Sequence, residues 1–384
     1  MIPLGKVPAR LDFEQIARET VADQAFIDLL QSAKISLIAA LRPSGVACFG
    51  VQDGGLFMSC TPTQITIGLA TDGKRLAIGG RREITLFAPS TRLAEHLPGK
   101  PKHHDVLFVP VNTYRTGECA AHEMMLDGPS AVFTNTQFSC LARADGFNSF
   151  LPLWKPPFIS ALMPEDRCHL NSFATDGNRV RYATAFAATD KPQGYRELPI
   201  DAGVIIDVEA NAVVATGLIK PHSVRIFDNK LYVLNSAAGE VRRVDLKARD
   251  SVTLATLPGF TRGLRMHDNV LFVGLSTLRA SARALGLPLG ERADSLIAGI
   301  AALDRDSGQL LGMLRLAPVI EELFDFVILP GFQRPHVLDP SPDAQAIGIE
   351  TPTGSYWMAA GTDLHHVKRA EADGKAPTVV ESSI

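Results

Sequence analysis

Three histidines stand in equivalent places in this sequence of 384 residues, each at the start of an apolar segment that ends in a tight turn. His122 opens "HEMMLDG", His169 opens "HLNSFATDG" and His222 opens "HSVRIFDN". Only 10 residues of the chain are histidine, so three at matching positions are not expected from composition. Neutral imidazoles that converge on one point suit zinc, copper or iron better than magnesium or calcium. We therefore predict a metal site at His122, His169 and His222, with zinc the expected ion and copper or iron the alternatives.

The same position in three further segments carries other polar residues, namely Gln64, Arg262 and either Glu321 or Glu322. An arginine beside the metal would hold a carboxylate or phosphate through two parallel hydrogen bonds. A glutamate there would be a fourth ligand, a partner of an imidazole or a general base. We predict Arg262, Glu321 and Glu322 as catalytic residues, and Gln64 and Arg262 as substrate contacts. The alternative is a structural ion pair between Arg262 and the glutamate that plugs the channel.

A recurring unit places these residues around one axis. The unit is a strand, an Asp-Gly or Asp-Asn turn and a second strand, and most copies are followed by a further strand pair. Its copies begin at Gln64, His122, His169, His222 and Arg262, so the steps between them are 58, 47, 53 and 40 residues. Repeats of about 40–50 residues with four strands each are typical of propeller blades. The sequence predicts an all-β fold, a six-bladed β-propeller, with seven blades as the alternative.

The two ends of the chain are expected to share the last blade. Its inner strand would begin at Glu321, and its outer strands would come from "SLIAAL" and "GVACFGVQ" near the N-terminus and from "AQAIGIE" and "SYWMAA" near the C-terminus. Residues 12–33 have apolar residues at helical spacing, so residues 1–34 are predicted as a helical segment. A second helix is possible over 276–286. The propeller domain is predicted over residues 35–361, followed by a polar tail over 362–384.

Long loops are predicted on the face where the inner strands begin, over residues 146–167, 186–198 and 276–295. They would cover a site and supply Trp154 and Tyr195 as substrate contacts. Tyr114 and Arg115 enter the second blade on the same face and are predicted as contacts too. By the same geometry, His103 and His104 precede an outer strand and belong to the opposite face, away from the axis.

Composition excludes several classes of partner. The formal net charge is −3 and the 38 Lys and Arg residues are scattered, so neither nucleic acid nor an anionic membrane is an expected partner. No apolar run approaches the roughly 20 residues of a spanning helix. The first residues lack a signal-peptide pattern, and we expect a cytoplasmic protein. The five cysteines have no C-x-x-C spacing and are predicted to be buried free thiols.

The segments "TNTQFSCLA", "PLWKPPFIS", "EDRCHLNSFATDG", "KPHS", "TRGL" and "EELFD" resemble a bacterial family of β-propellers with no established function. The resemblance covers most of residues 35–335 and implies the propeller but no reaction. By architecture alone, the ring is similar to that of metal-centred six-bladed propellers, which include gluconolactonase-type lactonases and a peptidyl-hydroxyglycine lyase with zinc on three histidines. The lactonases use acidic and amide ligands, from which this sequence departs. The lyase similarity implies an Arg and a Tyr near the metal, for which Arg262 and Tyr114, Tyr182 or Tyr195 are the counterparts.

These observations lead to one main hypothesis and two alternatives. The main hypothesis is a metal-dependent lyase or hydrolase that acts on a small carboxylate-bearing or peptide substrate held by Arg262. The first alternative is a non-catalytic scaffold that binds a protein or peptide partner on its open face. The second is a copper- or iron-dependent oxidase or oxygenase. The oligomeric state cannot be inferred from the sequence.

Overall fold

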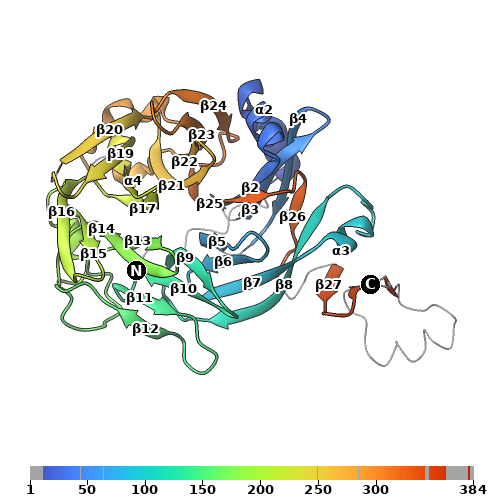
Figure 1. Cartoon of the computed structure of the whole chain (residues 1–384), viewed down its shortest axis with the longest axis horizontal. Coiled ribbons are helices and arrows are strands. Elements are labelled where there is room, and N and C mark those ends of the chain that lie inside the picture. Colours follow the sequence, from blue (N-terminus) through green and yellow to red (C-terminus); the bar gives the residue numbers. More distant parts are fainter. Residues whose placement is uncertain are drawn as a thin grey trace.

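The structure, a computed structural model, describes residues 12–43, 45–63, 65–248, 250–283, 285–341, 346–359 and 379–380. In this part of the chain, six sheets of four or five strands stand around a common axis as the blades of a propeller (Figure 1). The inner strands of neighbouring blades contact one another all the way round the ring. The six-bladed β-propeller predicted from the repeats is confirmed.

Five blades are each built from four consecutive strands, and the first strand of each lies innermost. Blade 2 comprises β5 (Thr66–Thr71), β6 (Leu76–Gly80), β7 (Glu83–Ser90) and β8 (Val106–Arg115), and blade 3 comprises β9 (Ala121–Asp127), β10 (Ser130–Asn135), β11 (Cys140–Arg143) and β12 (Leu151–Trp154). Blade 4 comprises β13 (Leu170–Asp176), β14 (Arg179–Ala185), β15 (Gly203–Asp207) and β16 (Ala212–Leu218). Blade 5 comprises β17 (His222–Phe227), β18 (Lys230–Asn235), β19 (Glu240–Asp245) and β20 (Asp250–Thr256), and blade 6 comprises β21 (Phe260–His267), β22 (Val270–Ser276), β23 (Gly299–Asp304) and β24 (Leu310–Arg315).

Tight turns join the first two strands of these blades where the sequence predicts them. Between β17 and β18, Asp228 and Asn229 have φ angles of 47° and 59°. Two successive residues with positive φ are the geometry of a type I′ turn, which matches the twist of the strands it connects. The Asp-Gly copies place Gly128 and Gly177 at φ angles of 56° and 57°. These turn residues therefore fix the hairpins between the first and second strands of their blades.

Blade 1 joins the two ends of the propeller. Its strands lie in the order β25 (Glu322–Pro330), β2 (Ile35–Arg42), β3 (Gly45–Gln52) and β4 (Gly55–Thr61). The prediction that both chain ends share a blade is confirmed, but the outer strands expected from the C-terminal side are wrong. Residues 55–61 fill the outermost position, and β27 (Ala346–Glu350), β28 (Ser355–Ala359) and β29 (Val379–Val380) form a separate sheet. Apart from Val379 and Val380 in β29, the predicted tail over 362–384 lies outside the described residues.

The N-terminal segment is two helices and not the single helix predicted over 12–33. Helix α1 (Phe13–Glu19) ends at Thr20, β1 (Val21–Ala22) adds to the edge of β24, and α2 (Gln24–Ala33) follows. Asp23 causes the restart, because its side chain accepts a hydrogen bond from the Phe26 amide at 2.8 Å as the N-cap of α2. The apolar face of α2 then packs into the core between blades 6 and 1 (Figure 1).

The remaining elements are short. They are α3 (Thr91–Glu95), α4 (Ala280–Arg283), the 3₁₀ turns η1 (Gly194–Arg196), η2 (Ser236–Ala238) and η3 (Pro288–Ser295), and β26 (Pro335–Val337), which pairs in parallel with β8. The helix considered over 276–286 is reduced to α4. All five cysteines are free, and only Cys60 is not fully buried. Of the helices in the described ranges, none is long and apolar enough to cross a membrane.

The start of each inner strand is irregular. The register shifts between Leu170 and Ser172 in β13, between His222 and Arg225 in β17 and between Thr261 and Leu264 in β21. Strands β5, β9 and β25 have comparable shifts near their starts. Such bulges release backbone groups from the ladder and re-aim side chains.

The released amides bind side chains of neighbouring blades. Val224 N donates to Ser172 Oγ at 3.2 Å, and Gly263 N donates to Ser223 Oγ at 3.0 Å. Equivalent bonds run from Leu323 N to Ser276 Oγ at 3.0 Å and from Leu69 N to Asp325 Oδ2 at 3.1 Å. The bulges thus connect blade to blade directly at the inner ring.

We expect Ser172→Ala to lower the free energy of unfolding by about 1–3 kcal/mol, the cost of a buried amide without a partner. Val224 is fully buried and its amide would lose that partner. Chemical denaturation measures the change, and the exposed Ser32→Ala in α2 is the control, expected to shift stability by less than about 0.5 kcal/mol. Equal effects of the two substitutions would contradict the role of the bond between blades.

Candidate functional site

The three predicted histidines lie together at one mouth of the channel, where the inner strands begin. The ring centres of His122 and His169 are 5.3 Å apart. The ring of Phe186 bridges the others, at 4.3 Å from His169 and 5.2 Å from His222. The structure therefore gathers residues from blades 3, 4 and 5 into one cluster, which is called the histidine mouth below.

Each histidine is held through its Nδ1 atom. His122 Nδ1 lies 2.9 Å from the Ala120 carbonyl oxygen, and His222 Nδ1 lies 3.1 Å from the Lys220 carbonyl oxygen. Because a carbonyl only accepts, these contacts favour the tautomer with the proton on Nδ1 in both rings. His169 Nδ1 lies 3.0 Å from Asp166 Oδ2, which favours the same tautomer. In all three rings, Nε2 is therefore the nitrogen with the free lone pair.

Burial, together with the positive charge around the histidine mouth, keeps the rings of His122 and His222 neutral. Burial lowers the pKa of His122 well below its ordinary value of 6.5, and the His169 and Arg262 charges lower it further. Burial likewise lowers the pKa of His222, followed by the charge of Arg262. Lys220 adds a further positive group, with its Nζ 4.8 Å from the centre of the Phe186 ring. The mouth is consequently short of negative charge.

The donor chemistry suits a zinc ion, because metal-bound histidines usually donate their second nitrogen to a carbonyl or carboxylate. The spacing does not suit it. Within the ranges that the structure describes, no group of three or more His, Cys, Asp or Glu residues is placed to hold a metal ion. As arranged here, the three histidines do not form such a group, and a metal on them stays a prediction.

Arg262 lies at the same mouth and has little to neutralise it. Its side chain is 9% exposed, its Nε has no hydrogen-bond partner, and its Nη1 is 4.0 Å from Glu322 Oε2. Burial lowers its pKa to about 10, although the Glu322 charge opposes that change. The guanidinium instead lies over the Phe324 ring, 4.5 Å from its centre. A buried cation that is so poorly paired is costly, and a hydrogen-bonded anion would offset that cost.

Glu322 cannot supply that charge because other arginines occupy it. Arg279 Nε and Nη2 each donate to its carboxylate at 2.7 Å, and Arg42 Nη1 donates at 2.8 Å. Burial raises the pKa of the carboxyl, but the Arg279 hydrogen bonds and the surrounding charges outweigh that effect and lower it. Glu322 thus stays ionised and holds the side chains of Arg279 and Arg42 in place. The side chain of Glu321 is exposed, and Gln64 lies outside the described residues.

Asp166 and Tyr195 complete the surroundings of His169. Tyr195 Oη donates to Asp166 Oδ2 at 3.0 Å, and burial together with the Asp166 charge raises the pKa of the tyrosine. Tyr195, predicted as a substrate contact, therefore acts on the carboxylate that orients His169. Asp166 was not predicted, although it precedes His169 by three residues. Its loop lies outside the repeat register on which the prediction depended.

Other predicted contacts lie away from the cluster. Trp154 is on β12, the outermost strand of blade 3, where its Nε1 donates to Asn211 Oδ1 at 3.0 Å. Tyr114 and Arg115 end β8, the fourth strand of blade 2; Tyr114 Oη donates to the Pro129 carbonyl oxygen at 2.7 Å. The structure does not bring these three residues to the histidine mouth.

His103 and His104 form a second cluster with His336, away from the axis as predicted for the first two. The rings of His104 and His336 stack with their centres 4.7 Å apart. Burial lowers the pKa of His104 to about 3 and that of His336 to about 4. This cluster packs beside Phe57 of blade 1 and takes no part in the mouth.

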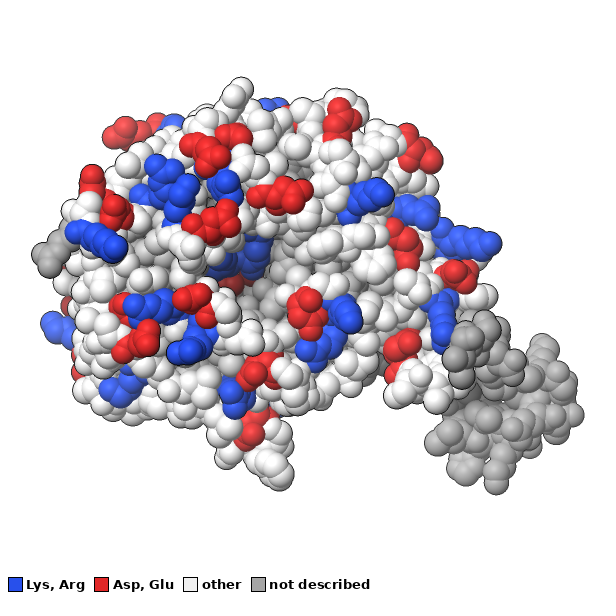
Figure 2. Space-filling model, viewed as in Figure 1, with Lys and Arg blue, Asp and Glu red and all other residues white. Residues whose placement is uncertain are grey.

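A network of ion pairs closes the middle of the channel. Arg225 Nη2 donates to both oxygens of Glu123 at 2.9 and 2.8 Å, and Arg265 Nη2 donates to Asp325 at 3.0 and 3.1 Å. Figure 2 shows the hollow at the centre of one face, with basic side chains at its bottom. The structural plug predicted for Arg262 and the glutamate is therefore formed by other residues, deeper in the channel.

Comparisons with known proteins agree with the fold. A family model described as a domain of unknown function (DUF4915) matches residues 24–338. A chain in the crystal structure of a nidogen/laminin complex is similar, with 12% identity, a TM-score of 0.50 and coverage of 77% of this chain and 99% of that one. A protein of unknown function from Bacteroides caccae has 10% identity and a TM-score of 0.46, with coverage of 77% and 98%. No curated protein matches the sequence.

Two buried arginines give contrasting predictions. Arg262→Met should leave the free energy of unfolding unchanged or raise it by about 1 kcal/mol, because it removes a poorly paired buried charge. Arg225 is the matched control, since its five N–H groups donate to Leu264, Phe173, Val224 and Glu123. Arg225→Met should cost about 3–5 kcal/mol. Urea denaturation of both variants measures the difference, and similar losses would show that Arg262 is a structural residue.

Proposed function

This chain belongs to the family described as a domain of unknown function (DUF4915), and we propose that its propeller is an enzyme for a small carboxylate-bearing substrate. The substrate would bind at the histidine mouth, with its carboxylate on Arg262. The reaction would be a lyase or hydrolase reaction in which His169 accepts a proton. Both roles follow from the position of the groups at the mouth.

The state of Arg262 carries the proposal. A guanidinium that is buried, with an unbonded Nε and its nearest carboxylate at 4.0 Å, is costly unless something binds it. A substrate carboxylate would supply two acceptors in the planar geometry that arginine matches. Lys220 nearby raises the positive potential, and its pKa is lowered by burial and by the charge of Arg196.

His169 is the residue placed to move a proton. Its Nδ1–H is directed at Asp166, so Nε2 is free to accept a proton while the carboxylate stabilises the imidazolium that forms. In a lyase, that proton would come from the carbon beside the substrate carboxylate, and the bonding pair would expel the leaving group. In a hydrolase, it would come from water as the oxygen attacks. Phe186 and Phe260 line the neighbouring positions and limit access of solvent.

The backbone around the histidine mouth supports a functional role. His169 has a φ angle of 54°, and Ala120 and Lys220 have values of 51° and 50°. These are left-handed conformations that cost residues other than glycine about 1 kcal/mol or more. Two of the three residues supply the carbonyl groups that hold His122 and His222. The strain therefore serves to set the tautomers of the rings.

The non-catalytic alternative has one observation in its favour. Phe147, at the tip of the hairpin between β11 and β12, is 99% exposed, and Leu151 and Leu153 on β12 are also exposed. Exposed apolar residues on an edge strand are typical of surfaces that bind a partner. This alternative expects no carboxylate to bind at the histidine mouth, so the next experiment separates the two.

We expect lactate, succinate or N-acetylglycine to stabilise the wild-type protein in thermal melts and to bind measurably by calorimetry. Arg262→Met should abolish the effect, whereas Arg179→Met, which changes an exposed arginine of β14, should retain it. Affinity should change little from pH 7 to pH 8. Burial first, and then the charges of Arg262 and the neighbouring imidazoles, lower the pKa of His122 and His222 well below 6.5, so both rings are neutral over this range. No response to any carboxylate in a panel of this kind would refute the proposal.

The metal hypothesis has its own test. If zinc binds on His122, His169 and His222 after a rearrangement of the rings, protein purified with zinc should hold about one ion per chain by mass spectrometry. His169→Ala should lose the ion, and His267→Ala, which changes a histidine outside the mouth, should keep it. If the protein holds no zinc under these conditions, the metal hypothesis is wrong and the proposed proton transfer by His169 involves no metal.

A further inference from the structure

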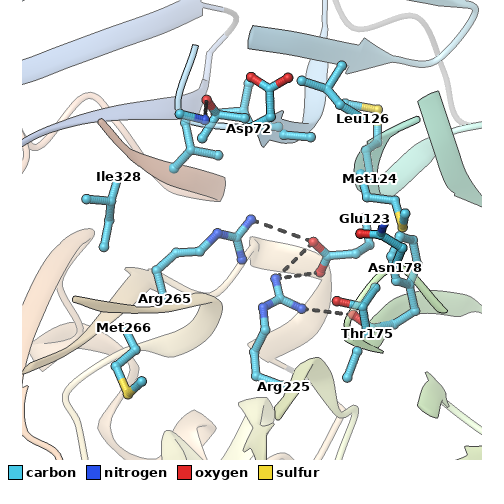
Figure 3. Close-up of a pocket in the computed structure, with 18 of the residues that line it drawn as sticks. Asp72, Glu123, Met124, Leu126, Thr175, Asn178, Arg225, Arg265, Met266 and Ile328 are labelled. Atoms are coloured by element: carbon cyan, nitrogen blue, oxygen red, sulfur yellow. Dashed lines mark hydrogen bonds and ion pairs between the residues drawn. The ribbon is translucent and has the colours of Figure 1, made fainter. Parts of the chain in front are cut away.

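A pocket opens at the mouth of the channel opposite the histidine mouth. It has a volume of about 490 Å³ and is lined by the ends of inner strands and the turns that follow them, including Thr71–Gly73 and Gly177–Asn178. The histidine mouth lies at the starts of the same strands, so the two sites face opposite sides of the ring. The ion-pair network of Glu123, Arg225 and Arg265 separates them and forms the floor of this pocket (Figure 3).

The floor carries no net charge. Arg225 and Arg265 are balanced by Glu123 and Asp325 through the hydrogen bonds described above. Arg225 has no N–H left for a ligand, because all five are used by protein acceptors. Arg265 uses one Nη1–H and its Nη2 group, so its Nε–H and second Nη1–H remain available. Each Glu123 oxygen retains a lone pair.

The floor thus presents hydrogen-bond donors of Arg265 next to acceptors of Glu123. Figure 3 shows these two side chains pointing toward each other. The distance between Arg265 Nη2 and Glu123 Oε1 is 3.6 Å. A carboxylate on this floor would meet the negative charge of Glu123, and an ammonium would meet two guanidinium groups. A carboxamide accepts from the arginine and donates to the glutamate without either conflict. A neutral donor–acceptor group is therefore the best match.

The walls combine apolar and polar residues. The apolar ones are Leu69, Met124, Phe173, Met266, Val327 and Ile328, and the polar ones include Thr71, Asp72, Thr175, Asn178 and His267. Methionine side chains are flexible and polarisable, so they adapt to aromatic or aliphatic ligands. The volume of this pocket lies within the range of small-molecule sites.

We propose that this mouth is a second ligand site, which binds a neutral small molecule with an apolar body and a carboxamide-like head. The apolar body lies against Met124, Met266 and Ile328, and the head contacts Arg265 and Glu123. The site differs in chemistry from the histidine mouth, which has an under-neutralised arginine and selects an anion. The proposal does not depend on the reaction proposed for that mouth.

Three probes of nearly the same shape test the choice of head group: phenylacetamide, phenylacetate and phenethylamine. The full-length chain is labelled with ¹³C at its methionine methyl groups. Met124 and Met266 report on the pocket, and Met58 and Met313, in β4 and β24, serve as internal controls. We expect saturable shifts of Met124 and Met266 with phenylacetamide, and affinities at least about tenfold lower for the two ions. Binding of phenylacetate at the histidine mouth would leave these two methyl groups unshifted.

Two variants test the assignment of the site. Glu123→Gln leaves both arginines short of charge, so the preference should reverse and phenylacetate should bind better than the amide. Ile328→Trp should fill the pocket and abolish the shifts, whereas Val252→Trp on the exposed face of β20 should not. The proposal is wrong if, in the wild-type protein, the three probes bind equally, the ions bind better, or the amide fails to shift the Met124 and Met266 signals. Unchanged Met58 and Met313 signals show that each variant is folded.

Discussion

The bond between a bulged amide and the neighbouring blade is the interaction on which the rest of the structure depends. A propeller has no single core shared by all its blades, so each blade must be tied to the next at the inner ring. Here the amides of Val224 and Gly263 leave their own ladder at the bulges, and those of Leu69 and Leu323 lie next to such bulges; all four donate to a side chain of an adjacent blade. The same bulges occur within the first few residues of the inner strands and turn those residues towards the mouth. The need to join blades therefore creates the rim on which His122, His222 and Arg262 stand.

The distribution of charge then distinguishes the two ends of the channel. Arg225 and Arg265 lie in the middle with carboxylates at hydrogen-bonding distance. Arg265 joins the neighbouring blades 6 and 1, and Arg225 of blade 5 pairs past blade 4 with Glu123 of blade 3. Arg262 is equally buried, but Arg279 and Arg42 occupy the glutamate that would pair with it. Three arginines share one carboxylate at that end. Burial and, after it, this excess of positive charge lower the pKa of His122 and His222, and the excess supports the anion proposed for this mouth; the charges of the ion-pair network deeper in the channel balance.

The parts of the structure that follow the repeat could be predicted from the sequence, and the parts that depart from it could not. The turns at Asp228 and Asp268 mark strand pairs, so the blades and the positions of His122, His169 and His222 follow from counting. Asp166, Phe186 and Arg279 come from insertions between strands, where no register exists, and their approach to the mouth depends on tertiary packing. The break at Asp23 escaped the helical pattern because one capping side chain outweighs the periodicity around it. Trp154 was placed on a covering loop because the short outer strand β12 has little strand signal of its own.

Blade 1 also imposes an order of assembly on the chain. Its strands β2, β3 and β4 leave the ribosome before the strands of blades 2 to 6, whereas β25, the strand that completes their sheet, begins 261 residues after the end of β4. Until then β2, whose residues 35–41 are all buried in the finished ring, presents an open edge of apolar residues. An exposed edge of this kind pairs readily with other nascent chains. The whole propeller must therefore be synthesised before its first three strands aggregate. The yield of folded protein then depends on translation speed and chaperone supply as well as on the stability of the finished fold.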